Sequence, residues 1–249
     1  MSGHSKWATI KRKKGAADAK RGQIFTKIIR EITTSARLGG GVIEANPRLR
    51  LAVQNAKDNN MPAKNIENAI LKGSGQLEGV TYEEITYEGY GPGGIAIIIE
   101  AMTDNKNRTV SDIRHILTKH NGNLGETGTV GWMFKTVGLI VVEAGKIGED
   151  ELMELVIEAG ADDMETGDEA YEIKTSLDKF EAVRAAIEKK GITPVSAEIT
   201  KLSQNSIKVE GDAAAKIMKL VELLEDHDDV QHVYANYDID DKEMDSLAK

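Results

Sequence analysis

Residues 82–101 read YEEITYEGYGPGGIAIIIEA, and this stretch decides the fold. Two runs rich in Ile, Tyr and Thr, at residues 82–90 and 95–101, flank the tetrapeptide Gly91-Pro92-Gly93-Gly94. Such runs on either side of a turn rich in Gly and Pro predict two neighbouring β-strands. The pattern changes here from helical to extended, so we place the start of a sheet-containing region at about residue 79.

Strand and helix patterns alternate from this hairpin to the end of the chain. The further predicted strands are residues 137–142, 171–175, 195–202 and 230–237. The predicted helices are one capped by Thr109 or Ser111 and those at residues 149–158, 177–189 and 213–224. Residues 132–200 hold one full strand–helix–strand–strand–helix–strand order, which is typical of ferredoxin-like domains. The flanking parts each supply strands and one helix, so we expect them to join into a second such domain; two sequential domains are the alternative.

The region before residue 79 has helical patterns. Apolar residues recur at helical spacing from about residue 16, and Gly39-Gly40-Gly41 ends the first predicted helix. Asn46 followed by Pro47 is a strong signal for the start of a second helix, which stops before Pro62. A third helix is predicted at residues 63–72. Three helices with short connections predict a small bundle.

The predicted fold class is therefore α+β and multidomain, with an N-terminal three-helix bundle followed by two ferredoxin-like α+β domains. The predicted domains are residues 1–78, residues 79–131 together with 201–249, and an inserted domain at residues 132–200.

The charge of the chain is divided between its N-terminal third and the rest. Residues 1–76 hold 15 Lys and Arg against five Asp and Glu, a net charge of +10. Residues 77–249 hold 17 bases and 36 acids, a net charge of −19, and the whole-chain value of −9 conceals this division. A basic module on an acidic body indicates that the module meets a polyanion. Nucleic acid is the polyanion we expect, because neutralised phosphates release counterions and that release drives binding.

Composition excludes several classes of protein. The chain has no Cys, which excludes disulfides, thiolate nucleophiles and Cys-based zinc or iron–sulfur sites. No stretch approaches ~18 uninterrupted apolar residues, so we expect no membrane-spanning helix and no membrane partner. The basic residues 1–14 lack the apolar core of a secretory signal and run straight into a patterned helix. We therefore expect a cytoplasmic protein.

The N-terminal string supplies the first candidate contacts with nucleic acid. It reads Ser2-Gly3-His4-Ser5-Lys6-Trp7, and four consecutive bases follow at residues 11–14. Lys and Arg bind phosphates, and Trp7 can stack on a base or wedge into a groove. The alternative is a solvated tail whose Trp7 and Ile10 dock on the helical bundle.

The first predicted helix extends this basic surface. Phe25 and Ile28 fall on one helical face, and Lys27, Arg30 and Arg37 fall on the other. We therefore predict that these three bases line one surface together with the N-terminal string. The complete set of predicted nucleic-acid-binding residues is Lys6, Trp7, Lys11, Arg12, Lys13, Lys14, Lys20, Arg21, Lys27, Arg30 and Arg37.

Three further patterns have both a chemical and a structural interpretation. The glycine-rich residues 89–94 could cradle a phosphate, but they lack the Lys-Ser/Thr ending of a P-loop and lead into a strand, which favours a hairpin turn. The segment Asp226-His227-Asp228-Asp229, with His232, could be a metal or acid–base cluster, but its place between a helix and a strand favours a polar turn. Asp162, Asp163, Glu165, Asp168 and Glu169 could bind a hard cation, but their spacing matches no defined metal loop, which favours a solvated acidic hairpin.

We expect no metal and no cofactor. The sequence has no nucleophile elbow, no H-E-x-x-H, no Walker motif and no recognisable triad around its five His. These features favour a protein that is not an enzyme. Metal-dependent hydrolysis at residues 162–169 is the enzymatic alternative.

Several long stretches resemble the YebC/PmpR family. They are residues 1–14, Arg21-Gly22-Gln23-Ile24-Phe25-Thr26-Lys27, Asn46-Pro47-Arg48-Leu49-Arg50, Ala56-Lys57-Asp58-Asn59-Asn60-Met61-Pro62, Tyr87-Glu88-Gly89-Tyr90-Gly91-Pro92 and Gly128-Thr129-Val130-Gly131-Trp132-Met133-Phe134. The resemblance covers essentially the whole chain. It implies a three-domain cytoplasmic protein. Bacterial members of that family are described as DNA-binding transcriptional regulators. Others, including the mitochondrial translational activator of cytochrome c oxidase subunit I, act at the ribosome.

We interpret the chain as a non-enzymatic regulator that binds nucleic acid. The first candidate function is that of a DNA-binding transcriptional regulatory protein, and the second is that of a ribosome-associated translation factor that binds ribosomal RNA. The acidic α+β domains would hold geometry or contact a protein of the ribosome or of the transcription machinery. Acidic bulk repels a long uniform duplex but tolerates the mixed RNA–protein surface of a ribosome, which favours the second candidate.

Overall fold

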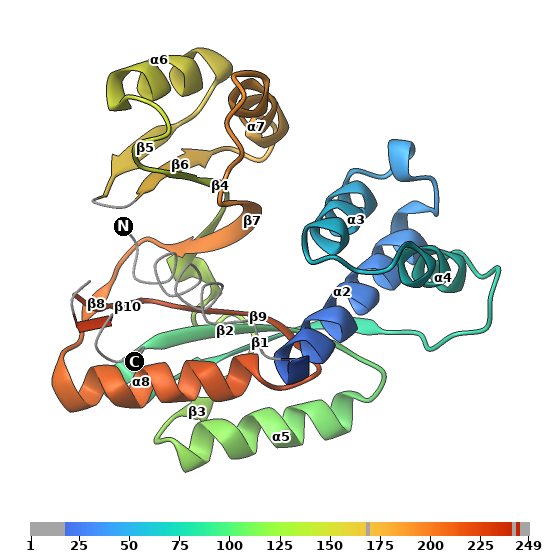
Figure 1. The fold of residues 1–249 in the computed structure, drawn as a ribbon. Helices are drawn as coiled ribbons and strands as arrows, with labels where there is room; N and C mark the ends of the chain where they lie inside the picture. Colours follow the sequence, from blue (N-terminus) through green and yellow to red (C-terminus); the bar gives the residue numbers. More distant parts are fainter. Residues whose placement is uncertain (1–17, 168–169, 241–242, 245–249) are drawn as a thin grey trace.

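The structure, a computed structural model, describes residues 18–167, 170–240 and 243–244 (Figure 1). Its first part is a helical unit made of α2 (Asp18–Gly39), α3 (Pro47–Asp58) and α4 (Ala63–Gly73), with a short 3-10 turn, η1 (Ile43–Ala45). The Asn46 Oδ1 atom accepts the Leu49 N–H at 3.1 Å, and Pro47 is the first residue of α3. This confirms the predicted helix start. Buried Ile32, Leu49 and Ala56 belong to the core of the unit.

The second unit is built on an antiparallel sheet. Its strands are β1 (Glu83–Tyr90), β2 (Ala96–Thr103), β3 (Asn123–Leu124) and β9 (Val230–Ala235), in the order β3-β1-β2-β9. The helices α5 (Lys106–Lys119) and α8 (Gly211–Glu225) pack on one face, where Ile97, Ile113 and Leu220 are fully buried. A small parallel pair, β8 (Ile207–Lys208) and β10 (Tyr237–Asp238), lies beside it. Strand β9 comes from near the end of the chain, so this sheet combines two distant segments.

The third unit lies between these two segments in the sequence. Its strands are β4 (Phe134–Glu143), β5 (Asp163–Thr166), β6 (Ala170–Thr175) and β7 (Ser196–Ser203), in the antiparallel order β5-β6-β4-β7. The helices α6 (Glu149–Ala159) and α7 (Phe180–Lys189) cover one face, around buried Ile140, Ile173 and Phe180. The order of strands and helices is ferredoxin-like.

Among the described elements, each sheet carries helices on one face only. We call the other face of each sheet its outer face. In Figure 1, α5 and α8 lie beneath the first sheet and α6 and α7 lie above the second, and strand β7 contacts strand β9. The two outer faces are therefore turned toward each other.

The predicted fold class, an N-terminal helical bundle followed by two ferredoxin-like α+β units, is confirmed. The boundaries of the three domains stay a proposal. The predicted capping of the helix after β2 by Thr109 or Ser111 is wrong, because Asn105 caps it, accepting the Arg108 N–H at 3.1 Å, and the helix begins at Lys106. Helix α7 begins three residues later than predicted, and the predicted strand 230–237 is interrupted at Asn236. The Asn236 side-chain oxygen accepts the Ala96 N–H at 2.7 Å.

Candidate nucleic-acid interface

The predicted basic residues of α2 fall into two groups, and the first lies in a contact with the first sheet unit. The Arg30 guanidinium lies 2.7 Å from the Asp229 carboxylate and donates to the backbone oxygens of Asp228 at 2.7 Å and Met102 at 3.0 Å. Lys27 donates to the Glu225 backbone oxygen at 2.6 Å. We call this contact the α2–Asp229 junction. Both side chains thus face the first sheet unit, where they bind the end of α8 and the turn before β9.

Asp229 is the centre of this junction. Its side chain is 3% exposed, and its Oδ2 atom accepts from Thr109 Oγ1 at 2.7 Å, from Arg108 at 2.9 Å and from Thr103 Oγ1 at 3.2 Å. Burial alone would raise the pKa of this carboxyl. The hydrogen bonds from Thr109, Arg108 and Arg30 outweigh burial and lower the pKa to about 2. The carboxylate is therefore charged, and it joins α2, α5 and β9.

Other bases also join the helical unit to β1. Arg37 is exposed and donates to the Tyr82 backbone oxygen at 2.6 Å. Arg48 bridges Glu31 at 2.7 Å and Glu84 at 2.6 Å. Part of the positive charge counted in the N-terminal third thus lies in intramolecular contacts, which orient the helical unit.

The remaining predicted contacts are not placed in that junction. Arg21 is exposed, with its guanidinium 5.5 Å from the centroid of the Phe25 ring. Lys6, Trp7, Lys11, Arg12, Lys13 and Lys14 lie outside the described residues, as does the side chain of Lys20. Their role in binding nucleic acid stays a prediction.

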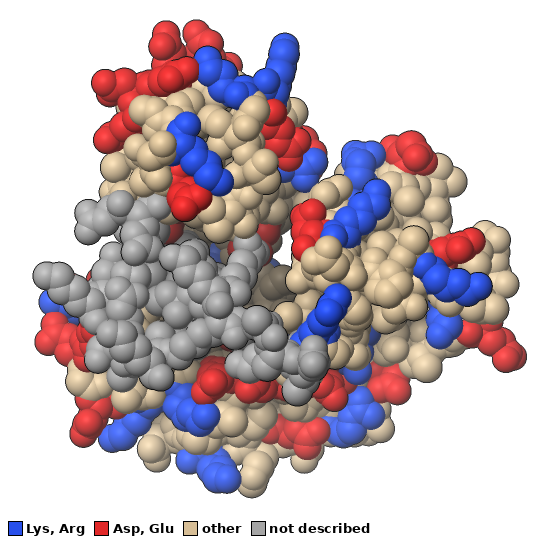
Figure 2. Space-filling view, in the orientation of Figure 1, with Lys and Arg blue, Asp and Glu red and all other residues tan. Residues whose placement is uncertain are grey.

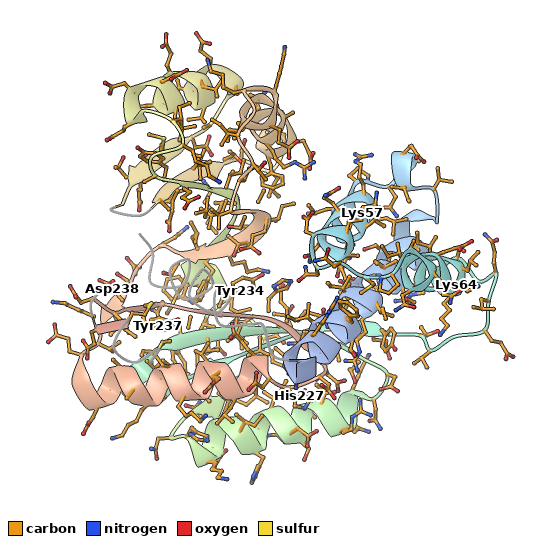
Figure 3. All side chains as sticks on the ribbon, viewed as in Figure 1. Lys57, Lys64, His227, Tyr234, Tyr237 and Asp238 are labelled. Atoms are coloured by element: carbon orange, nitrogen blue, oxygen red, sulfur yellow. The ribbon has the colours of Figure 1, made fainter. Side chains whose placement is uncertain are left out.

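Lysines of α3 and α4 form a second candidate surface, which is not part of the predicted set of nucleic-acid-binding residues. Lys57 near the end of α3 and Lys64 near the start of α4 are exposed (Figure 3). Lys72, near the end of α4, is exposed too. None of the three has an ion pair with a described residue. Asn60 closes the turn with a φ of 56°. In the sequence, these lysines contribute to the net positive charge of the N-terminal third. Asp58 and Glu67 lie among them, so the sequence shows no continuous basic cluster there.

The acidic residues predicted to form a solvated hairpin have structural contacts wherever the structure describes them. Asp163 and Glu165 of β5 both pair with Lys174 of β6, so β5 is a short acidic edge strand that sequence reasoning missed. Among the described residues, no group of three or more His, Asp and Glu side chains is arranged to hold a metal ion. Asp168 and Glu169 lie outside the described residues. Figure 2 shows acidic side chains gathered over α6, where Glu149, Asp150 and Glu151 are exposed.

The two His of the predicted polar cluster take part in local contacts. His227 lies 3.4 Å from Asp112 and accepts the Asp229 N–H at 3.1 Å through Nδ1. His232 stacks on Tyr234, with 5.9 Å between ring centroids. Figure 3 places His227 at the turn after α8. These His therefore support the α2–Asp229 junction and the outer face of the first sheet.

A buried carboxylate shapes the loop before β4, and this feature was not predicted. Glu88 is 7% exposed and accepts the N–H groups of Gly128 at 2.9 Å and of Val130 and Gly131 at 2.7 Å each. Burial opposes its ionisation, but the three amides together lower the pKa of Glu88. Trp132 follows directly and is 65% exposed. Glu88 thus holds the backbone of residues 128–131 in place.

The chain combines a basic helical unit with two acidic α+β units, and comparison with known proteins assigns it to a family. The model of the TACO1/YebC protein N-terminal domain matches residues 5–76, and the model of the TACO1/YebC second and third domain matches residues 82–237. The chain belongs to the TACO1/YebC family.

Relatives and a solved structure of this kind align over nearly their full lengths. A protein of Syntrophobacter fumaroxidans called "Probable transcriptional regulatory protein" is 57% identical, with all of both chains covered. A protein of Natranaerobius thermophilus with that description is 55% identical, covering 99% of this chain and 100% of the relative. The crystal structure of the conserved hypothetical protein Aq1575 from Aquifex aeolicus aligns with a TM-score of 0.82 at 47% identity, covering 90% of this chain and 93% of the other. Along the part of the chain that the structure describes, no helix combines the length and the apolar character needed to cross a membrane.

Proposed function

We propose that this protein is a non-enzymatic regulator that binds nucleic acid through its N-terminal third. The observation that carries the proposal is the division of charge, +10 in residues 1–76 against −19 in the rest. The proposed contacts are the N-terminal bases from Lys6 to Lys14 with Trp7, then Lys20 and Arg21, and the lysines at the α3–α4 turn. We reassign Lys27 and Arg30 to the α2–Asp229 junction, which holds the helical unit in place.

We place transcriptional regulation first, through duplex DNA, because the relatives at 55–57% identity are called probable transcriptional regulatory proteins. Translation through ribosomal RNA is the second candidate. A specific observation favours it. The acidic bulk of the two sheet units repels a long duplex within a Debye length, ~8–10 Å at ordinary salt, whereas a ribosome offers a mixed surface of RNA and protein.

A salt titration of the full-length chain tests the proposal. Binding to duplex DNA and to a structured ribosomal RNA fragment is followed by fluorescence anisotropy at several salt concentrations. We expect log K to fall with log salt, with a slope of about −0.9 per neutralised phosphate for duplex DNA or about −0.7 for single strands. The polymer that is bound more tightly at matched salt distinguishes the two candidates.

Two sets of charge reversals locate the interface. Lys11, Lys13 and Lys14 changed to Glu test the N-terminal string, and Lys57 and Lys64 changed to Glu test the α3–α4 turn. Each lost phosphate contact should flatten the slope by about one unit. The matched control reverses three exposed lysines outside the helical unit, Lys119, Lys189 and Lys216. Equal losses in the control and test variants would place binding elsewhere, and no binding by the unmodified chain would contradict the proposed function.

A further inference from the structure

The outer face of the second sheet carries a small apolar patch. Strand alternation points Ile140 and Val142 toward α6 and α7, so Leu139 and Val141 point to the outer face. Ala170, which pairs with Glu143, lies on the same face. Leu139 and Val141 are each 3% exposed and Ala170 is 7% exposed. These three form their own cluster, and no described apolar side chain from another unit packs against it.

Acidic residues surround this patch. Glu172 lies opposite Val141 on β6 and is fully buried, and Glu198 lies opposite Leu139 on β7. Residues directly opposite one another in an antiparallel pair point to the same face. Glu165 of β5 lies opposite Glu172 and extends the acidic border. Lys174 is the basic residue of β6 on this face. An apolar centre with an acidic border suits a ligand that is both apolar and basic.

The outer face of the first sheet lies across from this patch. Ala96, Ile98 and Tyr234 are buried there. Lys201 of β7 pairs with Glu100 of β2 and lies over the Tyr234 ring, at 5.2 Å from its centroid. Burial first, and then the carboxylates of Glu100 and Glu198, raise the pKa of Tyr234. Because Lys201 of the second sheet contacts Glu100 and Tyr234 of the first, the two sheets lie close together at this edge.

The N-terminal residues of the chain have the composition that such a surface requires. Residues 1–17 contain five Lys and Arg and no Asp or Glu, together with the apolar side chains of Trp7 and Ile10. An extended segment spans up to ~3.3–3.6 Å per residue, so this length reaches roughly 55–60 Å. Helix α2 contacts the end of α8, which packs on the first sheet, through Gln23, which donates to the Asp226 backbone oxygen at 3.4 Å. The segment thus joins α2 beside the first sheet, well within reach of both outer faces.

We propose that residues 1–17 dock between the two outer faces when no nucleic acid is bound, with Trp7 and Ile10 against the Leu139–Val141 patch and the bases toward Glu165, Glu172 and Glu198. While docked, these bases do not contact phosphates, although they are the same bases to which the function proposed above assigns phosphate contacts. Nucleic acid and the acidic face then compete for one segment. The docking is independent of nucleic acid, whereas the competition rests on the proposed function.

The emission of Trp7 reports docking directly. Trp132 is the only other Trp of the chain, and the exposed position of its side chain permits Trp132→Phe as a background in which Trp7 is the sole emitter. In the free full-length protein we expect blue-shifted emission that acrylamide quenches weakly. Val141→Lys, and separately Glu198→Lys, should shift the emission to the red and make it accessible to acrylamide. Glu158→Lys, an equal charge change on exposed α6, is the matched control and should leave the emission unchanged.

Far-UV circular dichroism and thermal unfolding establish that each variant is folded. Should Val141→Lys fail to fold, Glu198→Lys carries the test, because that side chain is only half-buried. Solvent-like Trp7 emission in the free Trp132→Phe protein overturns the proposal, and so does an equal red shift in Glu158→Lys.

A second readout uses nucleic acid. If the segment is undocked about one tenth of the time, its release by Glu198→Lys raises affinity about tenfold, because apparent affinity scales with the fraction of competent protein. Added duplex DNA or ribosomal RNA should also shift the Trp7 emission. Blue-shifted Trp7 with no binding of either polymer leaves docking in place and contradicts the proposed function alone. Binding without any change in Trp7 emission contradicts the competition.

Discussion

Arg30 and Asp229 are 199 positions apart in the sequence, and their side chains form an ion pair at 2.7 Å. Both are nearly buried, at 12% and 3% exposure. Arg30 also stacks on the Tyr82 ring at 5.2 Å from its centroid. This pair joins α2 of the helical unit to the turn before β9 of the first sheet. Together with the contacts of Arg37 and Arg48, it orients the basic helical unit.

Asp229→Ala should lower the free energy of unfolding by about 3–5 kcal/mol, because it leaves two guanidinium groups and buried threonine hydroxyls without their acceptor. Urea denaturation measures the change. Asp112→Ala is the control, since Asp112 is half-exposed and lies 3.4 Å from His227, and it should cost under about 1 kcal/mol. Similar losses in both variants would show that the junction carries little energy.

The stability of the protein should fall in acid because of the same carboxylate. The pKa of Asp229 is about 2 in the folded protein, below its ordinary value of 3.8. A lowered pKa contributes stability above the ordinary value, and the contribution is lost as pH falls from about 4 to about 2. The loss should be about 2 kcal/mol. Unfolding measured between pH 5 and pH 2 should therefore be less pH-dependent in Asp229→Asn than in the unmodified chain, and parallel curves would contradict the prediction.

Glu88→Ala should loosen the loop that carries Trp132. The substitution leaves the N–H groups of Gly128, Val130 and Gly131 without their shared acceptor, at a cost of about 1–3 kcal/mol for each one that stays buried. Hydrogen exchange at these three amides should accelerate, while the amides of α6 keep their rates. Unchanged exchange in the loop would show that water replaces the carboxylate without loss.

Two glycines of the helical unit should respond in opposite directions to the same change. A Cβ atom at Gly73 would lie 2.3 Å from the Thr33 backbone oxygen and 2.8 Å from the Ala36 Cβ atom, so Gly73→Ala should destabilise the protein by about 1–3 kcal/mol. A Cβ atom at Gly22 of α2 meets nothing within 4 Å, so Gly22→Ala should stabilise it by about 0.5–1 kcal/mol. Thermal unfolding compares the two. A stabilised Gly73→Ala would mean that α2 and α4 pack less closely than the structure shows.

Most elements of this fold could be predicted from local sequence signals. The elements whose position or existence was mispredicted show where local signals are insufficient. Asn46-Pro47 predicts the start of α3, because both the cap and the fixed φ of Pro act within a few residues. Strand β5 could not be predicted, because its acids suggest a solvated hairpin and only pairing with Lys174 on the next strand gives them a place in the sheet. Helix α5 begins at Lys106 because Asn105 caps it, and Thr109, the expected cap, donates instead to distant Asp229.

The candidate site likewise has features that local spacing predicts and contacts that it does not. Helical spacing correctly separated Lys27 and Arg30 from the apolar face of α2, but spacing carries no information about what covers the polar face. Acceptors in the turn after α8 cover it, and no local pattern relates that turn to α2. Lys57 and Lys64 were not predicted as a group, because their charges are separated along the chain and only the α3–α4 turn brings them to adjacent helix ends.

The pairing of β2 with β9 has a consequence for biosynthesis. Ala96 and Asn236, which meet where these strands join, are 140 positions apart. At about 5–20 residues per second, a ribosome needs roughly 7–28 s to make the chain between them. Throughout that interval β2, an almost wholly apolar strand, has an unpaired edge of the kind that other nascent chains can capture. The second sheet is synthesised entirely within the same interval, so it can fold while the first sheet is still incomplete.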